Sequence, residues 1–207
     1  REVSNELPIR GGKKINLSDC TVRMRTREDR WTTQLDVDYV SHTPLRNEIF
    51  AYLDAMCQKG VNEEGEDVVY NSENPLPGDP EKLRFLLRTL GTCLIRNVCT
   101  HLSIFHGESN CGKSLLMTLI DNILGGFAVS VDADILFNTA VARTDIVDLL
   151  SRRCVYVEDT GEYSTLNESK FKVLTGGGLQ RVREAHGKQK NVEACQFYGT
   201  MVLLTNI

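Results

Sequence analysis

The sequence predicts a mixed α/β protein that is built around a mostly parallel sheet. From about residue 99 onward, short apolar runs alternate with amphipathic helical patterns, and a glycine-rich turn follows the first run. Strands that are apolar on both faces, with helices between them, are typical of a parallel sheet covered on both sides. A smaller, mostly helical region precedes this part, so we expect two regions, residues 1–98 and 99–207.

The composition is that of an ordinary globular protein. Of its 207 residues, 41% are hydrophobic and 25% are charged. No apolar run reaches the roughly 18 residues of a membrane span, so we expect no membrane association. The net charge of -4 argues against non-specific coating of nucleic acid, although a local basic loop remains compatible with it. The seven cysteines show no zinc-ligand spacing, which predicts reduced thiols in a soluble intracellular protein.

The first region combines short strands with two helices. Alternating patterns predict strands at residues 15–17 and 34–39. Helical spacing after Pro44 predicts a helix that ends near Gly60, and a second helix runs from Pro80 toward Arg96. Residues 60–80 collect three of the five prolines and many polar residues, which is typical of a loop.

The second region alternates strands and helices. We expect strands at 102–106, 128–131, 154–157 and 200–205. We expect helices at 113–124, 145–150 and 167–174.

The glycine-rich turn matches the phosphate-binding pattern GxxxxGK[ST] in full. Its residues are Gly107, Glu108, Ser109, Asn110, Cys111, Gly112, Lys113 and Ser114. Glycines let the backbone amides converge on an anion, and the helix that follows adds the positive end of its dipole. Lys113 would reach the outer phosphates of a nucleotide such as ATP, and the Ser114 hydroxyl would bind Mg²⁺.

Polar residues follow two of the expected strands. Glu158 and Asp159 end the apolar run 154–157, where one carboxylate would hold the magnesium shell and the other would orient the attacking water. The sequence does not say which carboxylate has which task. Asn206 follows the last strand, where it is either a turn former or a hydrogen-bond donor to the γ-phosphate or the attacking water.

The order of these motifs resembles the superfamily-3 helicases, hexameric AAA+ motors of viruses and mobile elements. The matching segments are GESNCGKS, CVYVED, KVLTGGGLQRVREAHGKQ and VLLTN. Upstream, LPIRGGKKINL, RMRTREDRWTTQL and DVDY resemble the segment that precedes the motor in poxvirus-type and giant-virus primase-helicases. The resemblance implies a collar-like region over 1–98 and an AAA+ ATPase core over 99–207.

The resemblance also implies roles for individual residues. Lys113 and Ser114 would contact the nucleotide, Glu158 and Asp159 the metal and water, and Asn206 would be a polar sensor. The third motif would include a β-hairpin that grips DNA in the pore of a homo-hexamer. Its cations are Arg181, Arg183, His186 and Lys188. From charge alone, this stretch is equally a solvated basic turn.

Two features depart from the family pattern. Gly178 stands where relatives usually carry an acidic residue. The arginine finger of such motors lies beyond the sensor asparagine, so we expect an incomplete core that binds ATP and hydrolyses it weakly.

Three functions remain open at this stage. The first is an ATP-driven motor that moves on single-stranded or forked DNA during viral or mobile-element replication, in a cytoplasmic or nuclear location. An RNA helicase of the same superfamily and a nucleotide-gated loader or packaging scaffold are the alternatives.

Overall fold

The computed structural model describes residues 5–57, 78–97, 101–137, 149, 151–158, 165–176, 180–182 and 193–206. The chain forms two compact units. One joins Arg1–Tyr39 to Thr92–Ile207, and the other is Val40–Gly91. The expected boundary lay between residues 98 and 99, whereas the first 39 residues group with the later part of the chain.

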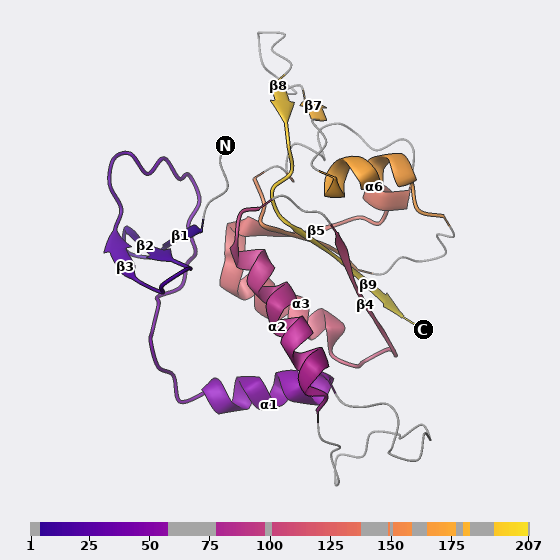
Figure 1. Cartoon of the computed structure of the whole chain (residues 1–207), viewed down its shortest axis with the longest axis horizontal. Coiled ribbons are helices and arrows are strands. Elements are labelled where there is room, and N and C mark those ends of the chain that lie inside the picture. The colour runs from indigo at the N-terminus through magenta and orange to yellow at the C-terminus, as the bar shows by residue number, and fades with distance from the viewer. Residues whose placement is uncertain are drawn as a thin grey trace. The chain divides into compact units, whose positions relative to one another are not determined.

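A four-stranded parallel sheet is the centre of the larger unit (Figure 1). Its strand order is β4 (Leu102–Gly107), β9 (Thr200–Asn206), β6 (Cys154–Val157) and β5 (Ala128–Val131). Every neighbouring pair is parallel, which confirms the expected mixed α/β fold. Because the strands are parallel, their carboxyl ends meet at one edge, where ligands of open α/β sheets usually bind.

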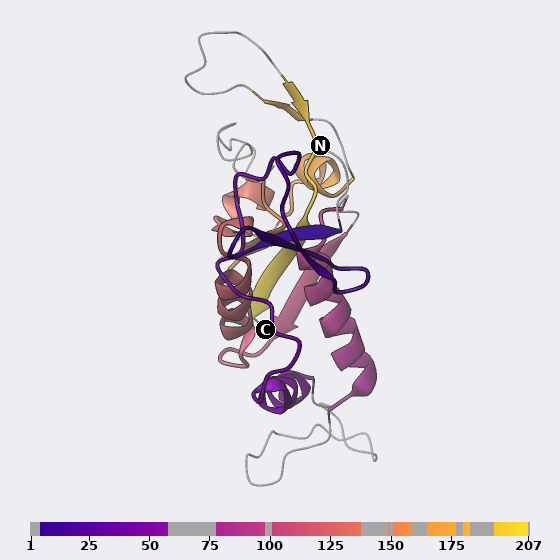
Figure 2. The ribbon, with the colours of Figure 1, turned by 90° about the vertical axis from the view of Figure 1, so that its left-hand side faces the viewer.

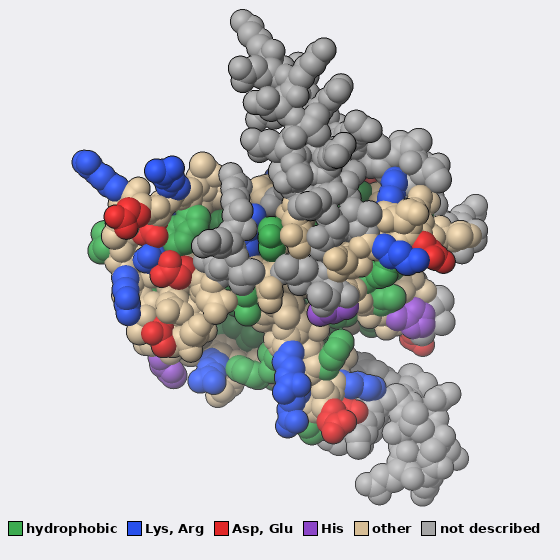
Figure 3. All heavy atoms as spheres, turned by 45° about the horizontal axis from the view of Figure 1, so that its top comes forward, with side chains coloured by type: hydrophobic (Ala, Val, Ile, Leu, Met, Phe, Trp, Pro, Cys, Tyr) green, Lys and Arg blue, Asp and Glu red, His purple; other side chains and the backbone are tan. Residues whose placement is uncertain are grey.

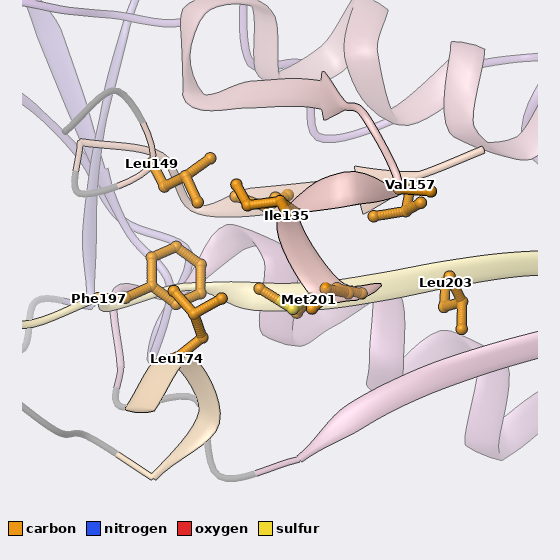
Figure 4. Packing of buried hydrophobic residues seen from close by; sticks show 10 residues of the cluster. Ile135, Leu149, Val157, Leu174, Phe197, Met201 and Leu203 are labelled. Carbon is orange, nitrogen blue, oxygen red and sulfur yellow. The ribbon is translucent and has the colours of Figure 1, made fainter. Parts of the chain in front are cut away.

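One face of this sheet carries the main apolar cluster (Figure 4). Val155 and Val157 alternate with the residues of the opposite face, as the period of a strand requires. Met201 and Leu203 of the neighbouring strand β9 lie in the same cluster. The helices α4 (Asp134–Phe137) and α6 (Glu168–Thr175) cover this face with Ile135 and Leu174, among others.

The opposite face of the sheet meets helix α3 (Lys113–Leu124), which has the bounds expected from the sequence. Its buried stripe is Leu116, Met117, Ile120 and Leu124. These positions recur at helical spacing and leave the first turn exposed at Ser114 and Leu115. A short 3-10 turn, η1 (Gly125–Phe127), leads from α3 into β5.

The edge strand β4 is less buried than the sequence predicted. Ile104 is 56% exposed, although Ser103 beside it is buried. Among the described residues, β4 pairs with one strand only, β9, which leaves its other edge uncovered. Strand β9 is central instead, and its first five residues are all buried.

The N-terminal segment forms an antiparallel sheet of three strands, β1 (Glu6–Ile9), β2 (Lys13–Asn16) and β3 (Val22–Met24). The strand expected at 15–17 overlaps β2, but the strand expected at 34–39 is wrong. This segment runs beside β1 through two backbone bonds, from Leu35 N to Pro8 O and from Arg10 N to Val37 O. The Arg10 side chain also binds the Asp36 carbonyl and carboxylate, which takes Asp36 out of a regular ladder.

The smaller unit contains helix α1 (Arg46–Met56) and most of helix α2 (Pro80–Leu94), as the helical patterns predicted. Pro80 suits the first position of a helix because its missing N–H would have no partner there. The Asp79 carboxylate accepts from the Glu81 amide at 2.9 Å and so caps α2. Most of the expected loop at 60–80 and of the expected helix at 145–150 lies outside the described residues.

Strands β7 (Gln180–Val182) and β8 (Glu193–Cys195) pair antiparallel, and the chain runs from β8 into the amino end of β9 (Figure 2). They therefore lie at the end of β9 opposite to its carboxyl tip. On the face drawn in Figure 3, the cations and anions of the described residues are interspersed. In the described part of the chain, no helix has the length and hydropathy needed to cross a membrane.

Candidate phosphate-binding site

The loop between β4 and α3 contains two residues with left-handed backbone. Asn110 has a φ of 64° and Gly112 a φ of 93°, both in the left-handed region. Left-handed residues that alternate with right-handed ones turn successive amides toward one hollow. Asparagine tolerates this conformation better than most residues, and glycine adopts it without strain.

Helix α3 starts without a side-chain cap because its N-cap residue is Gly112. The first hydrogen bond within the helix runs from Leu116 N to Gly112 O at 3.0 Å. The amides of Lys113, Ser114 and Leu115 therefore have no acceptor in the preceding turn. Such a helix start attracts an anion through these amides and the helix dipole.

Lys113 lies across the loop that it follows. Its ammonium donates to the Gly107 carbonyl at 2.9 Å, to the Glu108 carbonyl at 2.7 Å and to the Cys111 sulfur at 3.3 Å. A Cβ on Gly107 would lie 3.2 Å from that sulfur and 4.0 Å from the Lys113 Nζ. Glycine at 107 thus avoids a tight contact with the Cys111 sulfur, whereas the distance to the lysine is an ordinary van der Waals contact.

Asn206 lies at the same edge of the sheet as this loop. In the register of β4 and β9, Asn206 is the partner of Gly107, the last residue before the loop. Asn206 is exposed and ends its strand. The last residue of one strand thus stands beside the start of the glycine-rich turn.

Glu158 follows β6 at that edge and shares a sheet face with Asn206. Val157 pairs with Leu203, so Glu158 lies beside Leu204 of β9. Asn206 lies two residues further along β9. Side chains alternate along strands, so Tyr156, Glu158, Leu204 and Asn206 belong to the face that meets α3. Two interstrand spacings, about 10 Å, separate Glu158 from β4.

Tyr156 and Asp121 connect that strand to α3, a contact that the sequence analysis missed. The Tyr156 hydroxyl donates to Asp121 Oδ2 at 2.6 Å. Burial, the hydrogen bond to Asp121 and the nearby Glu158 charge raise the pKa of Tyr156. A tyrosine inside an apolar strand was the available signal, because a buried phenol usually has a polar partner.

Several expected site residues cannot be placed in this way. Asp159, Arg183, His186 and Lys188 lie outside the described residues, as does the side chain of Arg181. The pairing of β7 with β8 agrees with the expected hairpin, whose tip falls in the same undescribed segment.

Two described side-chain oxygens at this edge of the sheet are those of Ser114 and Glu158, which belong to separate elements. Within the described ranges, no three His, Cys, Asp or Glu residues gather closely enough to hold a metal ion. Mg²⁺ in nucleotide sites commonly takes one or two protein oxygens and completes its shell with phosphate and water. Ser114 at the start of α3 and Glu158 across the edge are oxygens of that kind.

Comparison with solved structures finds chains of similar structure. No family model matches the chain, and no curated protein matches it. A solved structure of the NrS-1 C-terminal region, in its apo A form, is similar with a TM-score of 0.43 and 14% identity. The match covers 62% of this chain and 30% of that chain. A likeness of this size is too slight to show a shared fold.

Proposed function

We propose that the chain binds a nucleoside triphosphate with Mg²⁺ at the carboxyl edge of its parallel sheet. The observation that supports this most strongly is the loop 107–112, which leads from a strand into an uncapped helix through two left-handed residues. The amides and Lys113 would hold the phosphates, and Ser114 with Glu158 or Asp159 would hold the metal. Bound Mg²⁺ would neutralise charge that develops on the phosphates.

Lys113 has a defined task in this proposal. It would exchange the carbonyls of Gly107 and Glu108, which it now contacts at 2.9 and 2.7 Å, for phosphate oxygens. A phosphate oxygen carries negative charge, so it attracts the ammonium more strongly than a neutral carbonyl does, which favours the exchange.

Calorimetry with Mg-ATP on the purified chain tests the proposal. Lys113→Ala should weaken binding by roughly 10- to 100-fold, which is the worth of a hydrogen bond between charged groups. Lys82→Ala is the matched control, because Lys82 is an exposed lysine of α2 that lies outside the four sequence motifs. Absence of binding by the wild-type chain, or equal affinity for the wild type and Lys113→Ala, would refute the proposal.

The larger role that we propose is that of a superfamily-3 motor that moves on DNA during genome replication as a homo-hexamer. It rests on the order of the four sequence motifs, with the phosphate loop, the acidic strand end, the basic segment and the terminal asparagine in series. The sheet is compatible with such a role, since β9 lies between the loop strand and the acidic strand.

Nucleotide-dependent strand displacement on matched DNA and RNA duplexes separates this role from an RNA helicase. ATP binding without directional movement would favour a loader or scaffold.

A further inference from the structure

The Tyr156–Asp121 hydrogen bond is short and well protected. Tyr156 is 4% exposed, and its hydroxyl lies 2.6 Å from Asp121 Oδ2. Bonds from a hydroxyl to a carboxylate have this length when they are charge-assisted, and they are among the stronger hydrogen bonds of proteins. Burial and Asp121 raise the pKa of Tyr156, so the phenol remains a donor at neutral pH.

The two residues belong to the two halves of the candidate site. Asp121 lies about two turns after Lys113 and Ser114 on the same helix, α3. Tyr156 lies two residues before Glu158 and on the same face of the sheet. The bond therefore joins the helix that begins at the phosphate loop to the strand that delivers the carboxylate.

The turn after α3 is held near the start of β6 by the bond from Arg153 N to Phe127 O, whereas the other described contacts of α3 with β6 itself are apolar. The remaining buried side chains of the helix are apolar, and apolar packing is non-directional. Thr118 donates to the Ser114 carbonyl within the helix, and Lys113 binds its own loop. Within the described residues, the Tyr156–Asp121 bond is the polar side-chain link between α3 and β6.

We propose that Asp121 and Tyr156 form a positioning pair that sets the place of Glu158 relative to the phosphate loop and so tunes the affinity for nucleotide-bound Mg²⁺. The inference rests on the proposed nucleotide site and goes further by assigning metal tuning to two residues that touch neither ligand. Groups that orient metal ligands from behind commonly change metal affinity or activity by about 10- to 100-fold when removed.

The test compares nucleotide affinity with and without Mg²⁺. Tyr156→Phe removes the hydroxyl and keeps the ring that packs in the sheet. We expect the Mg²⁺-dependent gain in ATP affinity to fall by about 10-fold, the lower end of the range for such groups. ATP affinity in EDTA should stay unchanged, because the loop amides and Lys113 are intact.

Three further variants separate positioning from general stability. Asp121→Ala should match Tyr156→Phe, whereas Asp121→Asn keeps an oxygen acceptor and should recover part of the Mg²⁺-dependent gain. Tyr198→Phe is the matched control, because the Tyr198 hydroxyl binds Gln196 at 3.1 Å just before the amino end of β9. It should leave both affinities at the wild-type values.

The outcomes distinguish this inference from the function on which it rests. Wild-type binding of Mg-ATP with an unchanged Mg²⁺-dependent gain in Tyr156→Phe would overturn the positioning pair and leave the nucleotide site standing. An equal loss of affinity with and without Mg²⁺ would show a structural contact only and would also overturn it. No ATP binding by the wild type would overturn both proposals. If Tyr156→Phe does not fold, Asp121→Asn and Asp121→Ala carry the same comparison.

Discussion

Arg153 is a buried cation that holds three parts of the larger unit together. Its guanidinium donates to the Leu94 carbonyl and, at 2.8 Å, to the Glu6 carbonyl, and it stacks 5.1 Å from the Phe127 ring centroid. Burial, with a smaller effect of nearby Arg96, lowers its pKa to about 10. The side chain is still charged at neutral pH, so its desolvation is offset by carbonyl dipoles and by the aromatic face.

We expect Arg153→Leu to lower the free energy of unfolding by about 2 kcal/mol, because it leaves two partly buried carbonyls without their donor. Arg27→Leu, at an exposed position, should change it by less than about 0.5 kcal/mol. Urea unfolding of the two variants measures the difference. Equal stability of both variants would mean that the carbonyl bonds of Arg153 make no net contribution.

At the scale of elements, two glycines differ in the space around them: Gly199 is crowded and Gly91 is not. A Cβ at Gly199 would lie 2.7 Å from the Phe197 ring and 2.9 Å from the carbonyls of Arg152 and Arg153. A Cβ at Gly91, inside helix α2, would meet nothing within 4 Å. The first glycine is required by the close approach before β9, and the second only weakens its helix.

Gly199→Ala should therefore destabilise the chain by about 1–3 kcal/mol, as overpacking does. Gly91→Ala should stabilise it by about 0.5–1 kcal/mol, which is the propensity difference in a helix. Thermal unfolding of the two alanine variants checks both signs. A stabilised Gly199→Ala variant would contradict the packing at the start of β9.

The elements that the sequence predicted well are those whose pattern and environment agree. The bounds of α3, β5 and β6 follow from their apolar residues, because each element buries them against the sheet or against the helices that cover it. The strand expected at 34–39 does not form for a specific reason. Apolar and polar residues alternate there, but the Arg10 side chain binds the carboxylate and the carbonyl of Asp36 and so interrupts the ladder. The pairing of β1, β2 and β3 could not be predicted, because the sequence does not indicate which short strands pair with each other.

Within the candidate site, the position of the loop could be predicted from the sequence, but the residues that lie beside the loop could not. The spacing of glycines and lysine indicates the loop, because the backbone geometry depends on local residues. The neighbourhood of Asn206 and Gly107 depends on the strand order, which places residues 99 positions apart side by side. The tyrosine in an apolar strand signals a buried phenol that needs a partner, but its bond to Asp121 depends on how α3 packs on the sheet.

For the whole molecule, a negative net charge stands against the proposed contact with DNA, and this can be tested. The net charge of -4 leaves DNA binding dependent on local cations. Replacing His186 and Lys188 with alanine should weaken single-stranded DNA binding and lower its salt slope by about 0.7 per lost phosphate contact. Nucleotide affinity should not change. Replacing exposed Arg27 and Arg30 instead is the control, and identical salt slopes for both double variants would remove the assigned DNA contact.

Amide chemical-shift mapping of the labelled chain with and without Mg-ATP tests the nucleotide site most directly. The account predicts that the largest shifts fall on residues 107–114, followed by Glu158 and Asn206 at the neighbouring strand ends. Lys113→Ala should need roughly 10- to 100-fold more ATP to produce the same shifts. Large shifts confined to other parts of the chain, or none at saturating Mg-ATP, would contradict it.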